Sequence, residues 1–207
     1  MPNLDRQCAD VQQAVEDLLA ESHQDLWGAI ATIEFLLDQK SFLSRVQQVR
    51  KEREGRSVEI LDYQPEFHAD FKRLNEEWIA KYFEMEAADY QSLNHPEEKI
   101  LKPGGHILMA RYQGAIVGSC ALIKVSDETY ELAKMSVTEK VQGQGIGWRL
   151  GQAAIQKARE LGTSKLFLES NTKLEPAIKL YQKLGFQRVV GSPSPYARCN
   201  IQMELNL

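Results

Sequence analysis

Apolar residues in the first 55 positions recur at the spacing of three and four that marks one face of a helix. Two such stripes run along Leu4, Cys8, Val11, Val15 and Leu18, and along Leu26, Ile30, Ile33 and Leu37. A third helix is predicted from Ser41 to the charged run before Gly55. Because helices this short are marginally stable alone, we expect the stripes to pack on the rest of the chain or on a second copy of it.

From Ser57 onward, apolar runs of strand length alternate with helical stretches. Helices are predicted at 67–83, 148–161 and 176–184. Strands are predicted at 57–63, 129–137, 165–170, 186–190 and 199–205, with two more inside 106–125 that are joined by the turn pair Gln113-Gly114. This order predicts a mixed α/β sheet domain over residues 57–207, preceded by a helical segment over residues 1–55.

Composition narrows the class of protein. The 207-residue chain has a formal net charge of −4, which argues against direct binding to nucleic acid through a basic surface. The three cysteines show no disulfide or metal-ligand pattern, so we expect a reduced, cytoplasmic protein. The sequence lacks an apolar leader and any uninterrupted run of about 18 apolar residues, so neither secretion nor association with a membrane is expected.

A glycine-rich run between a predicted strand and a predicted helix carries the clearest functional signal, and it reads Gln142, Gly143, Gln144, Gly145, Ile146 and Gly147. A turn at this place exposes free backbone N–H groups at the positive end of a helix, which is a site suited to phosphates. No lysine follows the glycines as a P-loop requires, and Trp148 and Leu150 stand where a dinucleotide fingerprint needs glycine.

The pattern Q-x-x-G-x-G resembles the pyrophosphate-binding loop of the GNAT (GCN5-related N-acetyltransferase) superfamily. A second motif agrees with it, because residues 166–186 resemble the fifth strand and following helix of that family, with the ending A-x-x-L-Y-x-x-L-G-F. The resemblance covers residues 57–207 and implies a mostly antiparallel sheet flanked by helices, with acetyl-CoA as the acetyl donor. Leu174 stands where many members have Asn, and Asn171 is expected to take over that contact.

The resemblance also implies site residues. The backbone of Met135, Ser136 and Val137 is expected to bind the pantetheine arm and to stabilise the oxyanion, beside the glycine loop and Asn171. Tyr181 matches the general acid of the family. Deprotonating a lysine-like amine at pH 7 costs about 4.6 kcal/mol, so a base is needed. Glu131, on the face of the strand that leads to the loop, is the candidate, with a solvated strand-end glutamate as the alternative.

The acceptor pocket is expected between the first helices of the domain and the loop that joins the last two strands. This position nominates Trp78, Tyr82, Tyr90, Tyr196 and Arg198, for which core packing or strand capping is the competing interpretation. Arg198 could pair with a carboxylate of the acceptor. The four histidines show no ligand spacing, and no metal is expected.

Residues 21–46 resemble the C-terminal helices of MarR-type regulators that carry a GNAT domain behind them. They are expected to form a homodimer or to brace the catalytic domain. The function predicted is an N-acetyltransferase that acts on a primary amine of a small molecule, peptide or protein, by direct attack in a ternary complex. The alternative is a non-catalytic acyl-CoA-binding sensor, which needs the glycine loop but not Tyr181 or a base.

Overall fold

The computed structural model describes residues 26–39, 58–191, 194 and 196–207, together with residues 13, 15, 17, 41 and 44. The chain divides into two compact units, Met1–Val49 and Arg50–Leu207. In the first unit, helix α2 spans Leu26–Gln39, as its apolar spacing predicted. The other two predicted N-terminal helices and the predicted boundary at 55–57 fall outside the continuously described residues.

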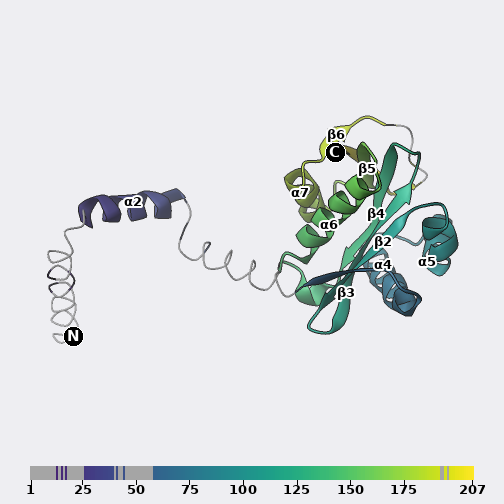
Figure 1. Ribbon diagram of the computed structural model, residues 1–207, viewed down its shortest axis with the longest axis horizontal. Helices are drawn as coiled ribbons and strands as arrows, with labels where there is room; N and C mark the ends of the chain where they lie inside the picture. The colour runs from purple at the N-terminus through teal and green to yellow at the C-terminus, as the bar shows by residue number, and fades with distance from the viewer. Residues whose placement is uncertain are drawn as a thin grey trace. The chain divides into compact units, whose positions relative to one another are not determined.

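The second unit is built on a seven-stranded sheet in the order β1-β2-β3-β4-β5-β7-β6 (Figure 1). Its strands are β1 (Glu59–Asp62), β2 (His106–Tyr112), β3 (Ala115–Lys124), β4 (Thr129–Val137), β5 (Lys165–Ser170), β6 (Gln187–Val189) and β7 (Ile201–Asn206). Every neighbouring pair is antiparallel except β4 and β5. The predicted mixed, mostly antiparallel α/β fold is therefore confirmed.

Helices cover both faces of this sheet. On one side lie α6 (Ile146–Glu160) and α7 (Glu175–Lys183), and on the other lie α4 (His68–Tyr82) and α5 (Ala87–Asn94) (Figure 1). Short helical turns occupy Pro65–Phe67, Glu97–Leu101 and Glu139–Val141. Helix α6 makes the crossover that joins β4 to β5, since parallel neighbours need a long connection.

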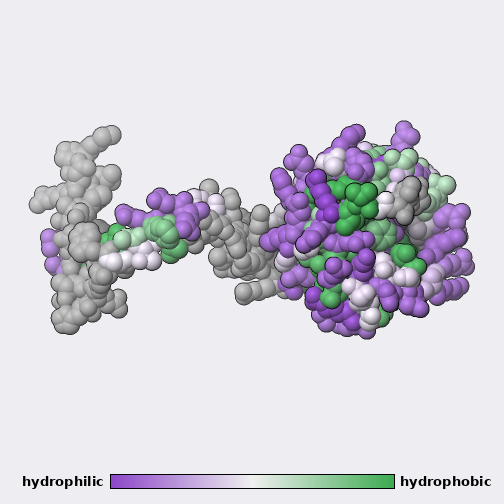
Figure 2. Space-filling view, turned by 90° about the horizontal axis from the view of Figure 1, so that it is seen from above, coloured by the Kyte–Doolittle hydropathy of each residue, from purple (hydrophilic) through white to green (hydrophobic). Residues whose placement is uncertain are grey.

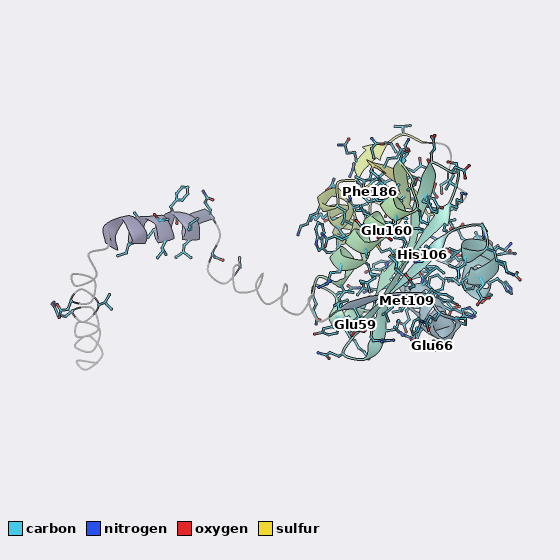
Figure 3. All side chains as sticks on the ribbon, viewed as in Figure 1. Glu59, Glu66, His106, Met109, Glu160 and Phe186 are labelled. Carbon is cyan, nitrogen blue, oxygen red and sulfur yellow. The ribbon has the colours of Figure 1, made fainter. Side chains whose placement is uncertain are left out.

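The alternation of side chains along the strands builds two cores. On β2, Leu108 and Ala110 pack in the core beneath α6 and α7, whereas Ile107 and Met109 pack in the core beneath α4. Met109, labelled on this strand in Figure 3, is fully buried. The face of this unit that Figure 2 shows is mostly hydrophilic, with hydrophobic atoms in patches.

One strand in the centre of the sheet carries an extra residue. Ala121 pairs with Ala133 and Ser119 pairs with Ser136, so three steps along β4 oppose two along β3. The extra residue forms a β-bulge, and Lys134 inside it has a φ of 51°, a value that is uncommon for residues other than glycine. A bulge bends its strand, and here β4 pairs with β5 only from Thr129 to Glu131. Both strands continue past this point, so the sheet opens between them.

The sequence analysis missed α5. Residues 84–94 carry no apolar repeat, and the helix begins instead with a reciprocal capping box. The Glu86 side chain accepts from the backbone N–H of Asp89, and the Asp89 side chain accepts from the backbone N–H of Glu86. The pair is acidic at both ends rather than the usual Ser or Thr followed by Glu, which is why the pattern was not found.

Candidate active site

The opening between β4 and β5 is lined as a cavity by side chains from both strands, from α4, α5 and α7, and from the segment before β7. Seven residues nominated from the sequence meet in this cavity, namely Trp78, Glu131, Met135, Asn171, Tyr181, Tyr196 and Arg198. Residues that are more than 100 positions apart in the chain thus share one site. The β-bulge in β4 positions these residues, because it separates β4 from β5 where their side chains project.

The remaining aromatic candidates lie elsewhere. Tyr82 is 41% exposed and lines a neighbouring cavity together with Trp78 and Gln142. Its ring belongs to an aromatic cluster in which Trp78 lies 6.0 Å from Tyr82 and 5.9 Å from Phe83 between ring centroids. Tyr90 is 49% exposed on α5 and lines neither cavity. Trp78 is therefore the aromatic residue of α4 that faces the opening between the strands.

The glycine loop precedes α6 in the conformation that anion binding requires. Gly143 and Gly145 have φ values of 80° and 83°, in the left-handed region that favours glycine. The first N–H groups of a helix lack intrahelical acceptors, and α6 begins at Ile146 directly after Gly145. A side chain at Gly143 would meet no heavy atom within 4 Å, so there is open space beside its backbone.

Other residues of the loop show how it is held. The Gln142 side chain donates to the Val137 carbonyl over 2.9 Å, which ties the loop to the end of β4. Gly147 packs closely on α7, since an added Cβ would lie 3.2 Å from a methyl group of Leu180. Gln144 Oε1 is buried, and among the described residues no donor reaches it. This acceptor, the free helix end and the open space fit the phosphates and amide groups of a coenzyme A molecule.

Glu131 has the electrostatics of a base that works near neutral pH. Burial raises the pKa of its carboxyl to about 7, and the neighbouring Glu169 adds to the rise, while Lys134 opposes it. A carboxylate with this pKa is substantially ionised at pH 7 and is a stronger proton acceptor than an ordinary glutamate. Burial dominates the environment of Glu131, whose side chain lines the cavity, and its role as a base stays a prediction.

Tyr181 keeps a neutral hydroxyl that can donate a hydrogen bond, although its raised pKa makes it a weaker acid. Burial raises the pKa of its phenol to about 12, with a further contribution from Cys120, so the hydroxyl keeps its proton at neutral pH. The ring is 9% exposed and meets Phe186 edge to face, with 6.1 Å between centroids. Figure 3 labels Phe186 beside α7. This contact fixes the ring of Tyr181 while its side chain still lines the cavity.

A buried cluster of charges closes one side of the cavity. The fully buried Asp89 carboxylate accepts from Lys134 Nζ over 2.8 Å. It also accepts from both terminal nitrogens of Arg198, over 2.7 and 2.8 Å, and Arg198 reaches Glu86 over 3.0 Å. Burial raises the pKa of Asp89, but the hydrogen bonds from Arg198 and Lys134 outweigh it and lower the pKa overall. The cluster joins α5, the bulge of β4 and the segment before β7.

Tyr196 and Asn171 complete the wall. Burial, Glu131 and Asp89 together raise the pKa of Tyr196 to about 12, and Arg198 lies 4.6 Å from the centre of its ring. Asn171 donates to the Arg198 carbonyl over 2.6 Å and accepts from the backbone N–H of Lys173 over 2.9 Å. Asn171 therefore fastens the end of β5 to the segment before β7. Ser136 of β4 is buried and shares a hydrogen bond of 3.1 Å with Ser119.

Sequence reasoning did not find Asp89, Glu86, Lys134 or Glu169. Lys134 alone gave a signal, as a charged residue inside an apolar strand.

Within the described residues no group of His, Cys, Asp and Glu could hold a metal ion. Instead, His106 pairs with Asp62 and His68 bonds to the Leu93 carbonyl. No helix in the described part of the chain is long and apolar enough to span a membrane.

Comparisons of sequence and of structure both relate this chain to acetyltransferases. The profile of the Acetyltransferase (GNAT) family matches residues 68–186. The uncharacterized N-acetyltransferase YjgM of Escherichia coli is 31% identical over 91 residues, which are 42% of this chain and 54% of that protein. The N-acetylaspartate synthetase of Danio rerio is 34% identical over 107 residues, 51% of this chain and 38% of that protein. The chain thus spans about half the length, or less, of these curated relatives.

Solved structures share the fold. A GNAT-family acetyltransferase of Staphylococcus aureus Mu50 superposes with a TM-score of 0.67 at 20% identity, covering 72% of this chain and 98% of that one. The YncA acetyltransferase of Salmonella typhimurium, solved with acetyl-CoA, superposes with a TM-score of 0.60 at 18% identity, covering 72% and 94%.

Gly143 provides a test of the phosphate site. Gly143→Ala places a methyl group in the open space beside the loop, so we expect the Kd for acetyl-CoA, measured by calorimetry, to rise about tenfold or more. Gly114→Ala is the matched control, because Gly114 has a φ of 81° and equally open surroundings, but lies in the β2–β3 turn. Both variants should lose about 1 kcal/mol of stability through backbone strain. Equal affinities for acetyl-CoA in the two variants would contradict the site.

Proposed function

Because the chain belongs to the acetyltransferase (GNAT) family, we propose that it transfers the acetyl group of acetyl-CoA to a primary amine. The observation that supports the proposal is the cavity at the opening between β4 and β5, which is lined by Glu131, the proposed base, and by Tyr181, the proposed proton donor. Acetyl-CoA supplies the acetyl group as an activated thioester. The loop from Gln142 to Gly147 and the backbone of Met135–Val137 are proposed to hold it.

The proposed reaction proceeds by direct attack in a ternary complex. Glu131 takes a proton from the ammonium, directly or through water, and the freed nitrogen attacks the thioester carbonyl carbon. The C–N bond forms and the C–S bond breaks. Backbone N–H groups of Met135–Val137 stabilise the negative charge on the carbonyl oxygen. Tyr181 gives its proton to the leaving sulfur and recovers one from the nitrogen, so the products are an amide, the free thiol and one released proton.

Relatives suggest which acceptors to test. The name of the Danio rerio relative refers to an acetylated amino acid. Amino acids therefore enter the first panel, together with small amines and peptide N-termini, which the sequence leaves open. The competing proposal, an acyl-CoA-binding sensor, predicts tight acetyl-CoA binding without release of thiol on any of them.

Tyr181→Phe tests the proton donor. The change removes one hydroxyl and keeps the ring contact with Phe186, so we expect unchanged stability and a kcat about a hundredfold lower, read as thiol release. Tyr112→Phe is the control, since Tyr112 is a buried tyrosine of β2 that does not line the cavity. A Tyr181→Phe enzyme with full kcat would refute this role.

Glu131→Gln tests the base. In the native protein kcat should rise with pH through about 7 as the carboxyl loses its proton, and the variant should lack this rise and fall about a hundredfold in kcat. Because the pKa is raised above its unfolded value, the native state holds a proton that the unfolded state releases between pH 4.5 and 7. Stability from this group is thus present at low pH and lost as pH rises.

The raised pKa of Glu131 also predicts how the free energy of unfolding changes with pH. Relative to the native protein, Glu131→Gln should gain on the order of 2 kcal/mol of unfolding free energy between pH 5 and pH 8 in denaturant titrations. Glu175→Gln, on the exposed start of α7, should show no such change. A pH profile of kcat shared by Glu131→Gln and the native enzyme would remove Glu131 from the mechanism.

We also propose that the N-terminal helices pair two chains. The resemblance of residues 21–46 to MarR-type helices stays a prediction, and the support is that α2 exposes Ile33, Phe35, Leu36 and Leu37. Hydrophobic atoms of this helix are visible at the surface in Figure 2. Light scattering should give twice the 23.6 kDa chain mass, and Ile33→Glu combined with Leu37→Glu should halve it, unlike Glu34→Gln. A native protein of single-chain mass would contradict the pairing.

A further inference from the structure

The two cations of the acceptor cavity are already neutralised by the protein itself. Arg198 binds Asp89 through both terminal nitrogens and Glu86 through one, and Lys134 binds Asp89. The side chains of Arg198 and Lys134 are 16% and 6% exposed, and that of Asp89 is fully buried. Two positive and two negative charges therefore form a closed set. Three of the five N–H donors of Arg198 are engaged by Asp89 and Glu86, so a carboxylate of an acceptor would meet a guanidinium whose charge is already paired.

The charges that remain at the cavity are negative. Glu131 and Glu169 project from neighbouring strands, and the register places Glu131 opposite Phe167, two residues before Glu169 and on the same face. The Glu169 carboxylate accepts from Ser194 Oγ over 2.6 Å and from Gln202 Nε2 over 2.9 Å, and both donors are uncharged. These hydrogen bonds hold Glu169 in place without cancelling its charge.

Ligand chemistry follows from this balance. An ammonium group entering the cavity meets the carboxylates of Glu131 and Glu169 and the ring of Trp78, all of which attract a cation. A carboxylate next to the reacting nitrogen would lose its water beside these two glutamates with no free cation among the described lining residues to receive it. The same pocket thus favours an ammonium group and disfavours a carboxylate.

We propose that the acceptor is a positively charged primary amine that bears no carboxylate next to its reacting nitrogen, selected by Glu131 and Glu169 while Asp89 keeps Arg198 and Lys134 occupied. The inference rests on the acetyltransferase function proposed above and names the substrate class of that same site. It assigns Arg198 to the framework of the pocket rather than to recognition of a substrate carboxylate. It also assigns Glu169 to specificity, since the reaction itself needs only one base.

The test compares amines that differ only in the carboxylate. Isopentylamine is paired with leucine, and phenethylamine with phenylalanine, and aspartate is added as a two-carboxylate acceptor. Binding to the full-length protein with saturating coenzyme A is measured by calorimetry, and turnover is measured separately as thiol released from acetyl-CoA. In each pair the decarboxylated amine should bind at least about tenfold more tightly and, when turned over, should have the higher kcat/KM.

Variants assign the preference to residues. Glu169→Gln should reduce the preference in each pair about tenfold, and Glu175→Gln should leave it unchanged. Asp89→Asn frees Arg198 and Lys134, so it should shift binding toward the amino acids. Because Asp89→Asn also leaves buried charges unpaired, it could fail to fold, and the test then depends on Glu169→Gln. Tighter binding of leucine, phenylalanine or aspartate, or a preference that Glu169→Gln does not alter, would overturn the proposal.

Separate measurements of binding and of turnover distinguish the proposed ligand class from the proposed transferase function. Selective binding of the carboxylate-free amines without any release of thiol would support the proposed ligand class and refute the proposed transferase function. Turnover that favours amino acids would support the proposed transferase function and refute the proposed ligand class.

Discussion

A single extra residue in β4 is the constraint on which the site depends. The bulge at Lys134 bends the strand away from β5 after only three paired residues, although hydrogen bonding to β3 resumes on the other edge. A continuous sheet at this place would have left no room for a ligand between the strands. The cost is a lysine backbone in the left-handed region, on the order of 1–3 kcal/mol. The ion pair between Lys134 and the buried Asp89 holds the strained residue in place.

The same ion pair links the bulge to the side of the pocket where the acceptor is proposed to bind. Asp89 lies in the first turn of α5, and its partners come from β4 and from the segment before β7, so three elements meet at one carboxylate. Removing one member of such a buried cluster leaves the others unpaired, which makes the arrangement cooperative. The geometry of the pocket and its electrostatic preference thus have one origin. Glu131 and Glu169 keep their negative character because the nearby cations are already used.

Much of this could be predicted from the sequence, and the remainder has a physical explanation. Alternation of apolar residues located the strands, and the glycines at 143 and 145 located the loop, because these signals are local. The cluster around Asp89 is not local, since its partners lie 45 and 109 positions away. Helix α5, which carries Asp89, has no apolar stripe and begins at a capping box between two acidic residues. The roles of Tyr181, Glu131 and the aromatic residues stay predictions, although the fold brings most of them to one cavity.

The proposed function depends on binding of acetyl-CoA in the opening between β4 and β5 and at the loop before α6. Hydrogen–deuterium exchange of the full chain with and without acetyl-CoA tests this most directly, because it reports on backbone amides without requiring turnover. We predict slower exchange on addition of acetyl-CoA at residues 132–137 and 142–148, with little change in β1 and β2. Unchanged exchange in both segments, or protection confined to another part of the chain, would contradict the claim.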